Sequence, residues 1–152
     1  MNLNIPYLET DNKLLNDAYR IAAGDIVGNI VYYQNGLLTE EKPCMIAGLD
    51  YNTPWTRDTA INIWNALSIL SPEVSKNTLL AVLEEEEGSI YIGGQYWDSI
   101  IWMIGAREYC RFHKDDNFYR LAFEAGRNSV HRLEEDEFDE EDGLFRGPAV
   151  YG

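Results

Sequence analysis

The first strong pattern in the chain is a helical spacing of apolar residues near its start. Between residues 11 and 35, apolar side chains recur every three or four positions, which is the spacing of one face of an α-helix. Thr10 or Asp11 can cap the start of this helix, and Gly36 can end it. The pattern predicts a leading helix over residues 11–35. Its apolar stripe consists of Leu15, Ala18, Tyr19, Ala22, Ile26, Ile30 and Tyr33.

Two later segments each combine a broadly apolar helix with a one-sided one. The first pair covers residues 57–86 and the second covers residues 96–134. In each pair the first helix is apolar on nearly every face, so we expect it to be buried on most sides, whereas the second carries a narrow stripe. Ser71 and Pro72 suit the cap and first position of a helix. The sequence therefore predicts two antiparallel helical hairpins.

The segments between these helices carry turn residues. Residues 40–56 contain Pro43, Gly48 and Pro54 and are expected to form an extended loop, while residues 88–94 suit a loop or a short hairpin. No pattern of a closed sheet is visible, and 152 residues suit one domain. We therefore predict an all-α fold of about five helices. Its antiparallel helical hairpins, with alternating inner and outer helices, are expected to form part of an (α/α)6 toroid.

Charge and composition narrow the classes of partner. The chain has 26 acidic and 12 basic residues and a net charge of -14, which disfavours nucleic acid and anionic membranes as partners. Acidic runs at residues 84–87 and 134–142 are interpreted as solvated helix ends and loop, because the second lacks the spacing of a calcium loop. No metal or cofactor is expected. Two cysteines and the absence of a signal peptide or long apolar run predict a cytoplasmic protein.

Polar and aromatic side chains gather in the two loops that enter the broadly apolar helices. The first loop runs from Asp50 to Thr59 and the second from Gly93 to Ser99, and each offers an aromatic ring, a carboxylate and a hydroxyl or amide. A sugar ring stacks on aromatics, and its hydroxyls bond to carboxylates, amides and guanidinium groups. The loops therefore suggest a carbohydrate site. Two structural alternatives stay open: an ion pair and cap at Arg57-Asp58, and a core role for Trp97.

One of these loops resembles a known family. Asp50-Tyr51 followed by Trp55-Thr56-Arg57-Asp58-Thr59 resembles the segment that opens the first inner helix of glucoamylases and related six-hairpin glycosidases. The second loop is similar to the next sugar-contacting loop of that family at Gln95 and Asp98. The resemblance continues more weakly as far as residue 145. It implies a substrate-binding site that consists of Tyr51, Trp55, Arg57, Asp58, Gln95, Trp97 and Asp98.

The resemblance also implies roles and an activity. Arg57 and Asp58 would hold hydroxyls of the terminal sugar, and Tyr51 and Trp55 would wall the site. The implied reaction is hydrolysis of a glycosidic bond at a non-reducing end, in an α-glucoside, with inversion by two carboxylates. Two alternatives remain: a glycoside phosphorylase of the same architecture, and a non-catalytic helical module that binds carbohydrate or protein.

The length of the chain limits this expectation. The family ring has twelve helices, and the chain supplies about five before a loop-like ending at residues 149–152. We therefore expect an N-terminal part of the catalytic domain, with the catalytic acid and base beyond Gly152 and no activity in the isolated chain. Residues 139–142 lie near the region of the acid but match no specific pattern. Inner helices without neighbours would expose apolar surface, so self-association through them is also expected.

Overall fold

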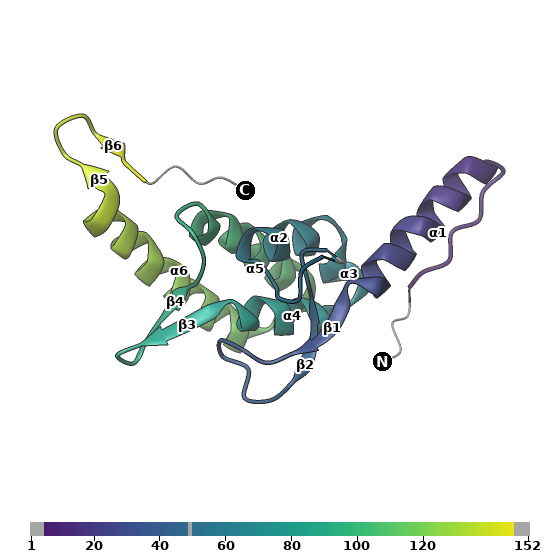
Figure 1. Cartoon of the computed structure of the whole chain (residues 1–152), viewed down its shortest axis with the longest axis horizontal. Helices are drawn as coiled ribbons and strands as arrows, with labels where there is room; N and C mark the ends of the chain where they lie inside the picture. The colour runs from purple at the N-terminus through teal and green to yellow at the C-terminus, as the bar shows by residue number, and fades with distance from the viewer. Residues whose placement is uncertain (1–4, 49, 148–152) are drawn as a thin grey trace.

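The structure is a computed structural model that describes residues 5–48 and 50–147, and it combines helices with strands (Figure 1). Three two-stranded antiparallel sheets accompany the helices within the described residues. The prediction of an all-α fold of helical hairpins forming part of an (α/α)6 toroid is therefore wrong. The loop predicted at residues 149–152 lies outside the described part of the chain.

The first sheet replaces the end of the predicted leading helix. Helix α1 (Lys13–Gly28) stops well before residue 35, and strand β1 (Ile30–Tyr33) pairs with β2 (Lys42–Met45), with Ile30 opposite Met45. Consecutive β-branched and aromatic residues favour this strand over further helix. The segment predicted as an extended loop supplies its partner. Between the strands, Gly36 has a φ of +59°, and an added Cβ would lie 2.6 Å from the carbonyl oxygens of Leu80 and Leu83.

The second sheet shortens a predicted helix. Helix α4 (Pro72–Ala81) ends before residue 86, and β3 (Leu83–Glu86) forms a hairpin with β4 (Ser89–Ile92). Glu87 and Gly88 both have positive φ, 51° and 80°, as a tight two-residue hairpin turn requires. A helix through this run would stack like charges on adjacent turns, whereas the hairpin solvates the glutamates and buries Leu83 against the core.

The remaining helices pack around α5 (Asp98–His113). One continuous helical segment consists of α2 (Thr56–Asn62), the π-helical turn η1 (Ile63–Leu67) and α3 (Ser68–Leu70). It crosses α5 closely, because a Cβ at Gly105 would lie 2.7 Å from the Ala60 Cα atom. Helix α6 (Asp116–Glu137) covers another side of α5 and ends in the small hairpin of β5 (Phe138–Asp139) and β6 (Leu144–Phe145).

Trp102 on α5 lies in the main core, where it is fully buried. Its ring is 6.4 Å from that of Phe118 on α6, and its Nε1 donates to the Leu79 carbonyl of α4 at 3.3 Å. The core thus links three helices, and its chief members are Met45, Ile63, Leu67, Val74, Leu79, Leu83, Ile92, Trp102, Ala106, Tyr109, Phe118 and Ala125.

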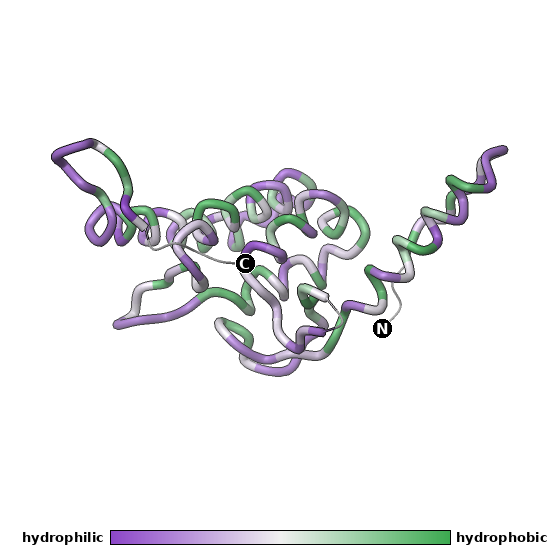
Figure 2. Tube along the Cα trace, turned by 45° about the horizontal axis from the view of Figure 1, so that its top comes forward, coloured by the Kyte–Doolittle hydropathy of each residue, from purple (hydrophilic) through white to green (hydrophobic). Residues whose placement is uncertain are grey.

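Other apolar side chains remain on the surface. Helix α1 has no buried residue and projects away from the rest of the molecule, with hydrophobic stretches along its length (Figures 1 and 2). Along the helical segment from α2 to α3 and along α5, a second exposed set comprises Ile61, Trp64, Ile69, Ile100, Ile104 and Phe112. These helices therefore expose apolar side chains, as expected, and self-association through them stays a prediction. No helix in the described residues is both long and apolar enough to cross a membrane.

Candidate functional site

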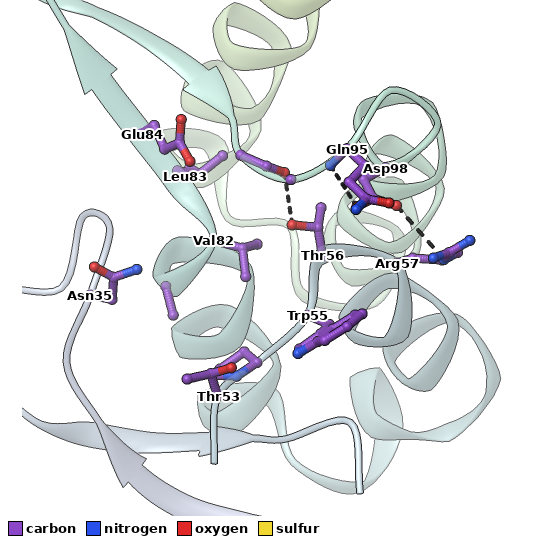
Figure 3. A pocket seen from close by; sticks show the side chains of 14 residues that line it. Asn35, Thr53, Trp55, Thr56, Arg57, Val82, Leu83, Glu84, Gln95 and Asp98 are labelled. Carbon is purple, nitrogen blue, oxygen red and sulfur yellow. Dashed lines mark hydrogen bonds and ion pairs between the residues drawn. The ribbon is translucent and has the colours of Figure 1, made fainter. Parts of the chain in front are cut away.

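A cavity of about 310 Å³ lies where the two predicted sugar loops meet (Figure 3). The first loop supplies residues 53–57 at the start of α2. The second supplies Gly93, Gly94 and Gln95, followed by Asp98 at the start of α5, and the turn from α4 into β3 supplies a third wall. The volume is at the lower end of the range of small-molecule sites. Segments far apart in the sequence therefore form one candidate site.

Arg57 and Asp98 form the charged centre of this cavity. Arg57 Nε lies 3.7 Å from Asp98 Oδ1, and Asp98 Oδ2 accepts a hydrogen bond of 2.8 Å from the Gln95 backbone N–H. Asp98 is 7% exposed, and its Oδ1 has no hydrogen-bond partner in the described structure. A buried carboxylate oxygen usually has a donor. This oxygen lies beneath the cavity surface and faces Arg57, so the ion pair is the interaction that compensates its charge.

Two consecutive glycines make this arrangement sterically feasible. An added Cβ at Gly94, where φ is +109°, would lie 2.7 Å from Asp98 Oδ2 and 2.8 Å from Thr56 Oγ1. A Cβ at Gly93 would lie 2.5 Å from Glu84 Oε1. Thr56 Oγ1 donates to the Gly93 carbonyl at 2.7 Å and so joins the two loops (Figure 3). Bare backbone thus forms the part of the wall closest to the charged groups.

An aromatic side chain forms another wall of the cavity. Trp55, which is 43% exposed, lines the cavity beside Arg57 (Figure 3). The Tyr51 ring stands edge-on to it, with the centroids 5.1 Å apart and the planes at 65°. Tyr51 therefore supports Trp55 from outside the cavity. An exposed indole held in place beside a paired carboxylate suits stacking against a sugar ring.

The predicted site residues divide into two groups. Trp55, Arg57, Gln95 and Asp98 line one cavity. Tyr51, Asp58 and Trp97 do not line it: Asp58 lies half-buried in the first turn of α2, and the Trp97 ring packs edge-on against Tyr96, with centroids 4.7 Å apart. The structural alternative of an ion pair between Arg57 and its neighbour Asp58 is absent from the described ion pairs, since Arg57 faces Asp98 instead.

Sequence reasoning missed Glu84 as a site residue. The glutamate run was interpreted as a solvated helix end, but Glu84 lies on β3 and lines the cavity near Gly93. The signal that could have found it is the alternation of Leu83 with Glu84, which places their side chains on opposite faces of a strand. The same reasoning missed Asn35, which reaches the cavity from the loop between β1 and β2 (Figure 3).

The acidic segment at residues 139–142 lies elsewhere. Asp139 and Asp142 bind Arg146, at 2.8 Å and 2.6 Å, within the hairpin that follows α6. Neither residue lines the cavity. Across the described chain, no cluster of three or more His, Cys, Asp and Glu side chains could hold a metal ion.

Comparison of this chain with protein-family models, curated proteins and solved structures gives no significant match. The chemistry of the cavity therefore carries the functional argument.

Proposed function

We propose that this chain binds the non-reducing end of an α-glucoside, in a site of the kind that glycoside hydrolases use. The observation that carries the proposal is the Asp98 carboxylate, buried beside Arg57, in a cavity walled by Trp55. Vicinal hydroxyls can donate to the carboxylate and accept from the guanidinium, while the ring stacks on the indole. The choice of glucose and of the α-linkage rests on the resemblance of the Asp50–Thr59 segment to glucoamylases.

The proposed reaction is hydrolysis of the bond to that terminal sugar. Inverting hydrolysis uses one carboxyl group as an acid and a second as a base. The cavity carries two carboxylates, Asp98 and Glu84, from different elements. Arg57 is the one cation among its described lining residues, and it is already paired. That charge balance disfavours a phosphate nucleophile and supports water over phosphorolysis.

The proposal includes a compartment. Cys44 and Cys110 are both free thiols in the described structure. Free thiols suit a reducing environment, so we place the protein in the cytoplasm.

The test is titration of the full chain with methyl α-glucoside, followed by the chemical shifts of backbone amides. We expect a Kd of about 1 mM, because only one side of the sugar is held. Asp98→Asn and Arg57→Met are each expected to weaken binding at least tenfold, since each removes a charge-assisted hydrogen bond. Arg20→Met is the matched control, because Arg20 forms an ion pair of 3.0 Å with Asp17 on α1, away from the cavity.

Two results would refute the proposed binding function. One is the absence of any shift at millimolar sugar. The other is equal binding by the wild type, Asp98→Asn and Arg57→Met. Turnover of an aryl α-glucoside, measured with and without phosphate, tests the reaction separately. A sugar phosphate as the sole product would replace hydrolysis by phosphorolysis.

A further inference from the structure

Helix α1 carries an apolar stripe that the described part of the chain leaves exposed. Leu14, Ala18 and Ile21 follow one another at intervals of four and three residues, the spacing of a face that packs against a second helix. Leu14 is 78% exposed, Ile21 is 63% exposed, and Ala18 is exposed between them. Leu15 and Ala22 are also exposed and widen this face. These five residues form one continuous surface, the α1 stripe.

The residues that precede α1 cover a different face of it. Residues 5–8 run back along the helix, and the Tyr19 hydroxyl donates to the Pro6 carbonyl (Figure 1). Between this segment and α1 lies a cavity, which the helix lines with Lys13, Asn16, Asp17, Tyr19, Arg20 and Ala23. None of the five stripe residues lines it. The segment therefore leaves the stripe open to a partner.

The charges of the molecule favour contact between two copies at α1 and disfavour it elsewhere. Within α1, Lys13 and Arg20 balance Asp17 and Asp25, so the net charge of -14 lies on the rest of the chain. Like charges repel where two acidic surfaces meet, whereas α1 is neutral and projects away from the rest of the molecule (Figures 1 and 2). A basic partner would be attracted to the acidic surfaces instead. The occupant that fits the α1 stripe is therefore the same stripe of a second copy.

The orientation of such a pair follows from where the charges lie. The C-terminal end of α1 adjoins the rest of the molecule, so a parallel pair would place two acidic regions side by side. An antiparallel pair separates them by the length of the 16-residue helix, about 24 Å. It also places the half of each helix that carries Lys13 and Arg20 alongside the half that carries Asp25. Antiparallel helix dipoles add a further attraction.

We propose that two copies of this chain associate through antiparallel pairing of their α1 stripes. The inference is independent of the proposed function, because no residue of α1 lines the cavity that contains Arg57 and Asp98. Two helices of this length bury less than the roughly 1,200 Å² of a standard interface, so we expect a Kd of about 10–100 µM. Pairing would also stabilise α1, which has no buried residue of its own.

The experiment is sedimentation velocity of the full chain at concentrations from about tenfold below to about tenfold above this Kd. The wild type should change from monomer to dimer over the range. Leu14→Gln and Ile21→Gln should each weaken association about tenfold, because each removes apolar surface from the contact while glutamine remains a good helix former. Val27→Gln is the matched control, since Val27 is an exposed apolar residue of α1 outside the stripe. It should leave association unchanged.

Asp25→Asn tests the orientation with a side chain of the same shape. Asp25 lies alongside the basic half of the partner helix in an antiparallel pair and beside its own counterpart in a parallel one. Loss of its charge should therefore weaken association about threefold at low salt. Strengthened association would refute the antiparallel arrangement.

Two further results would overturn the proposal. One is a wild type that stays monomeric over the whole range. The other is a dimer that Leu14→Gln and Ile21→Gln leave unchanged. If Trp64→Gln abolishes that dimer, the exposed set on α2, α3 and α5 forms the contact instead.

Discussion

Arg57, in the first turn of α2, faces Asp98, in the first turn of α5, with Arg57 Nε 3.7 Å from Asp98 Oδ1. This separation is longer than a hydrogen bond, so the pair attracts without saturating the carboxylate. The first turns of the two helices are therefore joined by electrostatic attraction without a direct hydrogen bond between the two side chains. The start of a helix also favours a negative charge. Asp98 lies in the first turn of α5, so the helix backbone stabilises its carboxylate.

Gly94 should be the most sensitive glycine of the site. Gly94→Ala forces a positive φ on alanine and drives Cβ into Asp98 and Thr56. We expect a loss of about 3 kcal/mol in the free energy of unfolding, measured with urea. Gly143→Ala is the control, because φ is also positive, +71°, but no atom lies within 4 Å; it should cost about 1 kcal/mol. Equal losses would show that the close contacts at Gly94 are not rigid.

The same substitution should have opposite signs at two helical glycines. Gly105→Ala places a Cβ 2.7 Å from the Ala60 Cα atom and should destabilise the protein by about 2 kcal/mol through overpacking. Gly24→Ala, on α1, meets no atom within 4 Å and should stabilise its helix by about 0.5–1 kcal/mol. Circular dichroism during thermal unfolding measures both. A stabilising Gly105→Ala would contradict the close crossing of α2 and α5.

Asp115 should make stability depend on pH. The hydrogen bond from Lys76 Nζ, at 2.5 Å, and the one from the Phe118 N–H hold the pKa of Asp115 below its usual range. Its stabilising contribution is therefore complete at neutral pH and is lost as pH falls from about 4 through the lowered pKa.

The variant that tests this is Asp115→Asn, which keeps a capping oxygen and loses the charge. It should be about 1 kcal/mol less stable than the wild type at pH 7 and equal to it near pH 2, by urea unfolding. Asp116→Asn changes an exposed neighbouring carboxylate and serves as the control. A stability difference for Asp115→Asn that persists at pH 2 would mean that the charge of Asp115 is not its source.

Cys44 should be inert in the folded protein. Burial raises the pKa of its thiol to about 12, against a small opposing effect of Thr78, so the reactive thiolate is scarce at pH 8. A disulfide reagent should label half-buried Cys110 first, and Cys44 only when the protein unfolds. The Cys110→Ser variant should then show no labelling before unfolding. Labelling of Cys44 in that variant without denaturant would contradict the buried position.

The sequence predicted helices better than it predicted where they end. The continuous helix of residues 56–70 and the start of α5 lie close to the expected positions, because apolar residues cover nearly every face there. The errors occur at Ile30–Tyr33 and Leu83–Glu86, where four-residue strands follow a helix. Such short strands carry too few residues for a period of two to be distinguished from a helical stripe. Each of these strands pairs with another strand across a turn, and this pairing decides whether the segment forms a strand or a helix.

The site could be predicted in part. Arg57 and Asp98 were both selected from residue type and resemblance, but their mutual contact depends on how α2 packs on α5. The contribution of Glu84 required a strand in place of a helix. Asp58 was expected beside its neighbour Arg57, whereas side chains adjacent along a helix point in different directions.

Because α1 projects from the rest of the molecule, its local unfolding should be separable from the global unfolding of the core. Its backbone hydrogen bonds are supported by no buried side chain, and a helix of this length is marginal without packing. Amide hydrogens of α1 should therefore exchange with solvent through fraying, at a rate that denaturant barely changes. Amide hydrogens of α5, around Trp102, should exchange only when the whole core unfolds. A short pulse of deuterated water would label α1 while the cavity and its supporting helices remain protonated.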